Sequence, residues 1–534
     1  LKNVAFQIDF YDNVLIHFDL KGAPPKVHYL IEIFKIARSN GATGILLEWE
    51  DTFPWSGILE QNRASEAYTI EEVDKILGAA TRLGLTVVPL VQTFGHLEWI
   101  LKVEKFRRYR ENDIYPQVVC LADNEGVDLV KEAIKQVINV HKKYGITYFH
   151  IGGDEAFEYG VCEKDVQWFR DNPGSTKEIL AAQHLKKIAE YVQSLIPGVR
   201  VLAWHDMIKD YPQTLIKETG LSDIIEPVVW DYSETLQQQS DMTWKMLSLS
   251  FSTVWGSSAY KGANTPSTQE ISLIHYMRNN QAWLSHKKLY GKYFKNFRGL
   301  ILTGWSRYDH FAVLTELLVS AIPSLVLNLQ VARVGPTGYE ALIVNETAKA
   351  LRCSNTITIT EPATLTTCVF PGVEVFKIIH GDLPELKTRL KFDLDSNHQL
   401  KGWLGRMNIR HNYTQQWYLS ALSVMLLPLQ RNLLTIEEKM RVAMSRMYSD
   451  NTIDEWLYEY FDPTAEKIQR YLDALERLSK IKTYPVRSFE IRRDLRQTAI
   501  SGGHNATVLR AFHVLKVVAV VVYLLLKICE IEAV

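Results

Sequence analysis

The sequence predicts an α/β fold, a (β/α)8 TIM barrel, with a helical carboxyl-terminal region. Eight short apolar segments recur over roughly the first 330 residues, and amphipathic helical patterns separate most of them, as a closed barrel requires. An open doubly wound sheet is the main alternative, but no apolar segment is followed by a glycine fingerprint for phosphate. With 534 residues and 47% hydrophobic content, the chain is long enough for a barrel and a further region.

The expected strands alternate with helices in a regular order. The first strand leads into a helix whose apolar residues keep helical spacing between positions 27 and 37, and Asn40 and Gly41 mark its end. We therefore place the barrel at residues 1–335. The predicted strands are 14–20, 43–48, 86–92, 146–152, 200–204, 224–230, 252–256 and 300–305.

The fourth predicted strand carries the most informative segment, ITYFHIGGDEAF at 146–157. Gly152 and Gly153 end the strand, and two carboxylates follow at once. Successive strand side chains point to opposite faces, so Asp154 and Glu155 would normally diverge. Glycine tolerates unusual backbone dihedrals, which lets both acids reach one pocket at the carboxyl end of the strand. The alternative is a strand followed by a solvated acidic turn.

Polar and aromatic side chains follow the other strands as well, and in a barrel the carboxyl ends of all strands converge on one face. Three strands end in tryptophan, and the apolar faces of sugar rings pack well on aromatic rings. The sequence therefore predicts a carbohydrate pocket at this face. Its substrate-binding candidates are Asp19, Asp51, His96, Trp204, Asp206, Trp230, Tyr232, Tyr260 and Trp305, while Glu48, Glu50 and Gln92 also follow strand ends.

The pattern changes after Asp309. A long apolar helix at 311–332 would complete the barrel, and the β-branched stretch 355–368 follows as an irregular connection. Residues 336–505 form a mainly helical region, with long helices at 415–448 and 453–481 and a break near Asp462 and Pro463. We expect it to pack on the barrel or on a second copy of the chain.

The last predicted region is an apolar tail at 506–534. Its apolar run, 517–526, is bounded by Lys516 and Lys527 and is shorter than the roughly 20 residues that a spanning helix needs. Packing or an oligomer contact, which would make a homodimer, is therefore favoured over a membrane anchor.

Composition limits the partners and the compartment. The formal net charge of -1, from 60 Lys+Arg against 61 Asp+Glu, gives no sign of a nucleic-acid surface, so we expect a neutral small molecule or glycan. The five cysteines are scattered and lack metal-ligand spacing, which favours a reducing compartment over a disulfide framework, although Cys353 and Cys368 could pair. No signal peptide is visible at the first residue, and we expect the cytoplasm and nucleus.

A carboxylic acid in a sugar pocket is the group that glycosidic bond cleavage needs, because it protonates the leaving oxygen. The common retaining mechanism places two carboxylates about 5 to 5.5 Å apart on either side of the bond, which neighbouring residues do not easily achieve. An adjacent pair fits another division of labour. If the sugar carries a 2-acetamido group, its carbonyl oxygen can attack the anomeric carbon, while Asp154 holds the amide N–H and Glu155 protonates the leaving group.

The H-x-G-G-D-E run from His150 to Glu155 resembles the signature of glycoside hydrolase family 20, the β-N-acetylhexosaminidases, whose substrate assistance is an established exception to the two-carboxylate scheme. Further stretches carry the same resemblance along the whole barrel. They are HFDLKGAPPK from His17, LVQTFGHLEW from Leu90, VVWDY from Val228, SAYKGA from Ser258 and ILTGWSRYDH from Ile301.

The resemblance implies a retaining exo-enzyme that removes terminal GalNAc or GlcNAc without a cofactor or metal, and a nucleocytoplasmic location. It makes Glu155 the general acid and later base, and Asp154 the group that orients the acetamido nitrogen. It also implies that Tyr260 holds the acetamido carbonyl. His96 matches a family histidine, Asp51 matches its acidic partner, and Trp204, Trp230 and Trp305 match the walls of the sugar pocket.

Two positions depart from the family pattern. Lys21 stands near the place of an arginine that binds sugar hydroxyls, and Arg307 stands where other members have a glutamate. Two alternatives from other classes remain open at this point. One is a glycan-binding barrel without activity, and the other is a metal-dependent hydrolase that uses histidines and aspartates at the mouth. The candidate metal ligands of this hydrolase would be His17, Asp19, His96, His150, His205 and Asp206.

Overall fold

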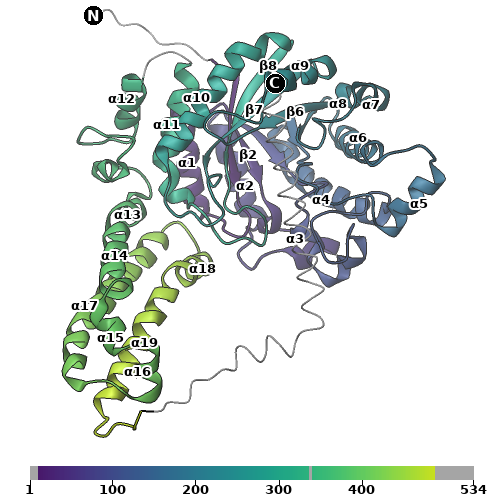
Figure 1. Ribbon diagram of the computed structural model, residues 1–534. Helices are drawn as coiled ribbons and strands as arrows, with labels where there is room; N and C mark the ends of the chain where they lie inside the picture. The colour runs from purple at the N-terminus through teal and green to yellow at the C-terminus, as the bar shows by residue number, and fades with distance from the viewer. Residues whose placement is uncertain (1–9, 336–339, 488–534) are drawn as a thin grey trace, which may run out of the picture. The chain divides into compact units, whose positions relative to one another are not determined.

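The computed structural model describes residues 10–335 and 340–487. Eight parallel strands pair in chain order, and β8 closes on β1 to complete the predicted barrel (Figure 1). Each predicted strand overlaps an observed one. The strands are β1 (Asn13–Asp19), β2 (Gly44–Glu48), β3 (Thr86–Leu90), β4 (Tyr148–His150), β5 (Arg200–Trp204), β6 (Ile225–Trp230), β7 (Thr253–Lys261) and β8 (Asn296–Gly304).

Helices surround the strands and connect them (Figure 1). Local chemistry sets their ends: the Thr69 hydroxyl accepts from the Glu72 backbone N–H and the Glu72 carboxylate accepts from the Thr69 N–H, a capping box that begins α2. The barrel helices are α1 (Val27–Ser39), α2 (Ile70–Arg82), α3 (Glu98–Leu101), α4 (Asn124–His141), α5 (Glu163–Asp171), α6 (Lys177–Leu195), α7 (Gln213–Thr219), α8 (Leu221–Ile224), α9 (Asp241–Ser250), α10 (Leu273–Tyr290) and α11 (Ile322–Val334).

The strands are buried on both faces, which is why they appear in the sequence as apolar runs rather than alternating patterns. All five residues of β2 and all nine of β7 are buried. Large side chains fill the interior of the barrel, so the interior is a packed core and not a channel. This core consists of Leu15, Leu46, Val88, Leu90, Tyr148, Leu202, Trp204, Val228, Trp255 and Ile301.

Among the boundaries that differ from the prediction, two change the placement of residues near the site. Strand β7 continues to Lys261, beyond the predicted end at Gly256, because the small residues that follow are buried strand residues and not a turn. The predicted helix 311–332 is wrong at its start, since α11 begins at Ile322 with Pro323 in its first turn. The Asp309 carboxylate instead accepts from the Phe311 N–H and holds a non-helical turn there.

The carboxyl-terminal region is helical, as expected. The long helix and the break near Asp462 are confirmed, since α17, α18 and α19 are separate helices. The helices are α12 (Glu340–Ala350), α13 (Val373–Lys377), α14 (Leu383–Leu390), α15 (His398–Trp403), α16 (Arg406–His411), α17 (Gln416–Met444), α18 (Asp450–Tyr460) and α19 (Asp462–Ser479).

The chain forms two compact units, and the boundary between them does not lie at residue 335. One unit comprises Leu1–Ser396 and Met425–Arg470, and the other comprises Asn397–Val424 and Tyr471–Val534. The predicted apolar tail at 506–534 lies outside the described residues. Within the described ranges, α17 is long and apolar enough to cross a membrane by length and composition, two properties that core helices share.

The structure pairs four of the five cysteines as Cys120–Cys162 and Cys353–Cys368. The second pair is the one that the sequence suggested. The expectation that the cysteines form no disulfide framework is wrong. Cys120 and Cys162 are 42 positions apart in the sequence and are brought together by the fold, so their spacing did not predict the pair. Cys529 lies outside the described residues.

Candidate active site

The loops after β3 and β4 meet at the carboxyl end of the barrel, and glycines permit the approach. Gly152 and Gly153 have φ angles of 64° and 91°, and a Cβ atom at Gly152 would collide with the Gln92 side chain. Glu155 (φ 46°) and His96 (φ 53°) also lie in the left-handed region. Residues other than glycine rarely adopt this conformation, and such strained positions cluster at functional sites.

Asp154 and Glu155 reach the same cavity, as the two glycines predict, and His96 lies between them. The His96 Nε2 atom is 3.2 Å from Glu155 Oε2 and 3.6 Å from Asp154 Oδ2. The two acids differ in their surroundings: the Asp154 side chain is 10% exposed and the Glu155 side chain 38% exposed. One acid is therefore enclosed at the base of the cavity, and the other faces its opening.

The electrostatics of the pair follow from this burial. Burial raises the pKa of Asp154 to about 8, and the neighbouring carboxylates of Asp206 and Glu155 act in the same direction. Burial alone would lower the pKa of His96, but the Asp154 carboxylate and the hydrogen bond to Glu155 outweigh it and raise that pKa to about 10. The contact with the two carboxyl groups therefore favours the protonated form of His96.

Asp206 holds Glu155 and Trp230 in place through two hydrogen bonds. Its Oδ2 atom accepts the backbone N–H of Glu155 (2.9 Å), and its Oδ1 atom accepts the indole N–H of Trp230 (3.0 Å). Both bonds fix groups that border the cavity, while the Asp206 carboxylate is outside the cavity lining. The predicted substrate-binding Asp206 therefore positions Glu155 and Trp230.

The cavity has a volume of ≈ 130 Å³. Aromatic rings form much of its wall: Trp230 and Tyr232 stack with centroids 5.4 Å apart, and Trp305 lies edge-on to Tyr232 at 6.5 Å. Acids, an amide and aromatic faces thus converge on one small space, the combination that binds a sugar. The lining residues are Lys21, Glu48, Gln92, His96, Asp154, Glu155, Trp230, Tyr232, Gly262, Ala263, Trp305 and Tyr308.

Two aromatic residues predicted for the pocket wall lie elsewhere. Tyr260 is fully buried within β7, and its hydroxyl donates to the His17 carbonyl oxygen (3.2 Å). The prediction placed Tyr260 in a loop because it ended the strand at Gly256. Trp204 belongs to the barrel core, against His150 and beneath the cavity lining rather than in it.

Asp19 and Asp51 also hold protein groups. The Asp19 carboxylate accepts from the Lys21 ammonium (2.9 Å) and from the Ser306 N–H (2.7 Å), and Asp51 accepts from the Gly22 N–H (3.0 Å). These bonds tie the loops after β1, β2 and β8 together. Neither carboxylate borders the cavity, so their effect on a ligand passes through Lys21 and the loop backbone.

Lys21 and Glu48 are lining residues that the sequence prediction left out of the site. Burial disfavours the Lys21 cation, but Asp19, Glu48 and Glu50 together raise its pKa above the usual value. The Lys21 Nζ atom also lies 5.1 Å from the Trp305 ring centroid. Tyr308 is a further lining residue that was missed, and its place three residues after Trp305 was the available signal.

Arg307, the second departure from the family pattern, does not face the cavity. Its Nη1 and Nη2 atoms donate to the Glu455 carboxylate of α18 at 2.5 and 2.6 Å, and Nη2 also donates to the Gly22 carbonyl. Arg307 therefore joins the loop after β8 to the carboxyl-terminal helices. Of the six residues of the metal-hydrolase alternative, none belongs to a group of three potential ligands within the described ranges.

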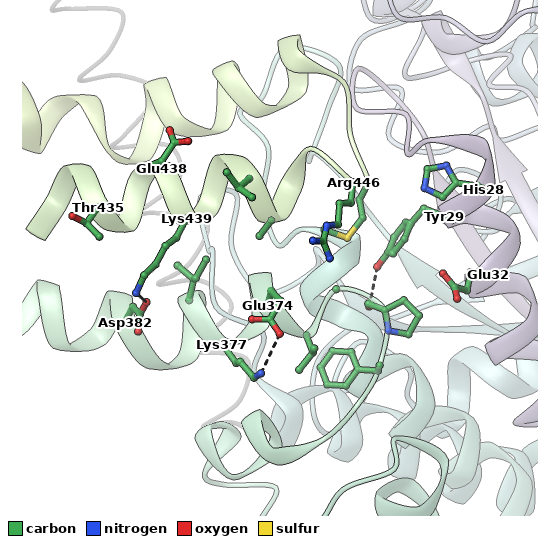
Figure 2. Close-up of a pocket in the computed structure, with 18 of the residues that line it drawn as sticks. His28, Tyr29, Glu32, Glu374, Lys377, Asp382, Thr435, Glu438, Lys439 and Arg446 are labelled. Atoms are coloured by element: carbon green, nitrogen blue, oxygen red, sulfur yellow. Dashed lines mark hydrogen bonds and ion pairs between the residues drawn. The ribbon is translucent and has the colours of Figure 1, made fainter.

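A larger hollow of ≈ 1330 Å³ lies among residues of α1, α13 and α17 (Figure 2). Its charged side chains pair with one another: Lys377 with Glu374 at 3.1 Å and Lys439 with Asp382 at 3.2 Å. None of the described residues that line it is a tryptophan. The smaller cavity in the barrel, by contrast, combines tryptophan rings with the predicted acid pair.

The chain is similar in sequence to several known proteins. Residues 40–296 match the glycosyl hydrolase family 20 catalytic domain. Human hexosaminidase D is 33% identical over 467 residues, which cover 87% of this chain and 94% of the relative, and bovine hexosaminidase D is 41% identical over 318 residues, which cover 59% and 90%. A β-N-acetylhexosaminidase from Bacteroides fragilis superposes with a TM-score of 0.48 at 16% identity, covering 64% of this chain and 70% of that one. With this identity along nearly the full length of a relative, the chain belongs to glycosyl hydrolase family 20, and it is a glycoside hydrolase of the hexosaminidase group.

Proposed function

We propose that the enzyme is an exo-acting, retaining β-N-acetylhexosaminidase that uses the 2-acetamido group of its substrate as the nucleophile. One observation carries this proposal: a buried Asp154 and a more exposed Glu155 border one aromatic cavity and contact the same histidine. The cavity of ≈ 130 Å³ is below the roughly 300–1,000 Å³ of pockets for drug-sized ligands, which suits a single terminal sugar.

The two acids have different tasks in this reaction. Glu155 donates a proton to the glycosidic oxygen as the bond breaks, while the acetamido carbonyl oxygen attacks the anomeric carbon and closes a five-membered ring. In its ionised form Asp154 accepts the amide N–H and stabilises the positive charge that develops on that ring, and this charge opposes the protonation that burial favours in the free enzyme. Glu155 then removes a proton from water, which opens the ring from the opposite face. Two displacements leave the anomeric configuration unchanged.

Tyr232 is the residue we assign to the acetamido carbonyl, in place of Tyr260. Tyr232 borders the cavity, stacks on Trp230 and lies near enough to Asp154 for that carboxylate to contribute to its raised pKa, after the larger effect of burial. Its hydroxyl is then a neutral donor over the whole range in which the enzyme works. A neutral donor suits a carbonyl oxygen that gains charge as it attacks.

A panel of aryl glycosides tests the proposal. We expect turnover of aryl β-GalNAc and β-GlcNAc, and almost none of the matching β-glucoside, because the glucoside has no acetamido nucleophile. Comparable turnover of the glucoside would contradict substrate assistance. Binding of the sugars without turnover between pH 4 and 8 would instead favour a glycan-binding barrel. The ratio of the two N-acetyl substrates measures the GalNAc preference.

The compartment, the membrane relation and the homodimer stay predictions. The sequence favours the cytoplasm and nucleus, whereas disulfides persist mainly in oxidising compartments. Differential alkylation of the cysteines in intact cells, before and after reduction, distinguishes the two. Sedimentation of the purified chain tests whether it forms a homodimer.

A further inference from the structure

A cluster of four side chains lies between the segment after β3 and the start of α5. Glu111, Cys120, Cys162 and Asp165 each offer one ligand atom, and these atoms lie within 4.8 Å of one another. Glu111 and Asp165 are 3% and 0% exposed. The residue types are two sulfurs and two carboxylates, a set that zinc accepts.

The fold brings these residues together from two segments. An antiparallel bridge between Arg110 and Val119 places Glu111 beside Cys120. Cys162 is the N-cap of α5, and its sulfur accepts the N–H of Asp165 at 3.3 Å. The cluster therefore links the segment after β3 to the start of α5.

In each carboxylate of the cluster, one oxygen accepts a backbone N–H and the other does not. Glu111 Oε1 accepts the Cys162 N–H at 2.8 Å, and Asp165 Oδ1 accepts the Ala122 N–H at 2.7 Å. The other oxygens, Glu111 Oε2 and Asp165 Oδ2, are buried and receive no hydrogen bond from the backbone, and the two carboxyl groups lie close enough to shift each other's pKa. Buried polar atoms of this kind are costly and call for a partner, and a cation is the natural one for carboxylates.

We propose that the Cys120–Cys162 pair, once reduced, forms with Glu111 and Asp165 a four-ligand zinc site. Zinc takes thiolates and carboxylates in tetrahedral geometry. Calcium and magnesium prefer oxygen ligands alone, so the two sulfurs select against them. In a tetrahedral site with Zn–S bonds of about 2.3 Å, the sulfurs are roughly 3.8 Å apart, so the disulfide and the zinc form exclude each other.

Conversion of the Cys120–Cys162 disulfide to the zinc form requires a two-electron reductant. A phosphine reductant supplies two electrons and becomes the phosphine oxide, while one water molecule supplies the oxide oxygen and the two protons that complete the thiols as the S–S bond breaks. Zinc binding then releases both thiol protons as the two Zn–S bonds form. The site thus keeps the two segments joined in a reducing compartment, where the disulfide does not persist. The segments are also linked by the Asn112 amide, which donates to the Glu158 carboxylate at 2.7 Å.

Cobalt is the spectroscopic probe for the test. The full chain is reduced with a phosphine, desalted without oxygen and titrated with Co²⁺. We expect one equivalent to bind, with thiolate-to-cobalt absorption and the visible bands of a tetrahedral site, and Zn²⁺ to displace it. The unreduced chain should show neither. A reduced wild-type chain without these bands would refute the site, and a proton shared between Glu111 and Asp165 would then explain the cluster.

The second disulfide provides a matched control. Cys162→Ser and Glu111→Gln should lose the absorption, while the double variant Cys353→Ser and Cys368→Ser should keep it. Alkylation of the reduced wild type keeps the test decisive even if a variant fails to fold. Zn²⁺ should protect the cysteines at 120 and 162 from iodoacetamide and leave those at 353 and 368 reactive, and equal reactivity at all four would overturn the proposal.

Discussion

His96 bonds to Glu155 and lies close to Asp154. Substituting each acid in turn separates their roles in catalysis. Glu155→Gln keeps the shape and removes the transferable proton. We expect a loss of about 10²–10⁴-fold in kcat/KM with aryl glycosides whose leaving groups are poor. Activated leaving groups need little protonation, so the loss with them should be much smaller. An equal loss in both series would show that Glu155 is not the proton donor.

Asp154→Asn should behave differently on both activity and stability. Turnover should fall with poor and activated leaving groups alike, because the acetamido group loses its carboxylate partner. The pKa of Asp154 is raised to about 8 by burial, so the folded state disfavours the charged form. Its ionisation destabilises the folded state increasingly from about pH 4 to pH 8 and is without effect below that range.

The neutral asparagine removes this penalty. We therefore expect Asp154→Asn to raise the melting temperature at pH 8 by roughly 2–4 °C and to leave it nearly unchanged at pH 4. Thermal unfolding of both proteins across that range measures the difference. A lower melting temperature for Asp154→Asn at pH 8 would mean that the Asp154 carboxylate stabilises His96 more than its own burial costs.

The proposed role of Tyr232 yields a paired test with Tyr260. Tyr232→Phe should lower kcat by about 10²-fold or more, in the range of a lost oxyanion-type donor, with little change in stability. Tyr260→Phe removes a buried hydrogen bond to the His17 carbonyl and should lower the free energy of unfolding by about 1 kcal/mol with nearly normal turnover. The opposite result, with turnover lost only in Tyr260→Phe, would restore the assignment made from the sequence.

At the scale of elements, an ion pair between Arg307 and Glu455 contributes to the attachment of α18 to the barrel. The Arg307 side chain is 9% exposed and the Glu455 side chain 40% exposed. Glu455→Gln leaves a largely buried guanidinium without its carboxylate, and we expect the free energy of unfolding to fall by about 1–2 kcal/mol after allowance for solvent at Glu455.

The neighbouring residue on α18 supplies the control for this prediction. Asp454 pairs with Arg441, and the two side chains are 59% and 40% exposed. Asp454→Asn should change the free energy of unfolding by less than about 0.5 kcal/mol. Denaturant unfolding of both variants is the measurement. Equal effects would show that the Arg307 pair is no more than a surface contact.

The elements that the sequence predicted well are those with a local signal. Fully buried strands produce apolar runs, and β4 with its two glycines placed the acid pair correctly. Strand β7 was cut short because its small residues resemble a turn, and that error moved Tyr260 into the pocket. The roles of Asp206 and Arg307 depend on partners brought by other segments, Glu155 and α18, which no local pattern contains.

At the scale of the whole molecule, the barrel also contacts residues that follow position 335. The Lys26 N–H donates to the Met447 carbonyl at 2.7 Å, and the Thr452 hydroxyl donates to Glu66 at 2.9 Å. The Tyr460 hydroxyl donates to the Leu314 carbonyl, and Trp456 on the same helix is fully buried. Residues 425–470 accordingly belong to the same compact unit as the barrel.

A chain truncated after residue 335 should therefore be unstable although its strands are complete. It would lose the hydrogen bond from the Tyr460 hydroxyl to the Leu314 carbonyl and leave Arg307 without its carboxylate. We expect its melting temperature to fall by more than about 5 °C and its soluble yield to drop. Supplying residues 340–534 as a separate chain should restore part of the loss, because the contacts need not be covalent. If the truncated chain had the melting temperature of the full protein and the same turnover of aryl β-GalNAc, α18 would not be needed for stability or activity. The barrel alone would then be the enzyme.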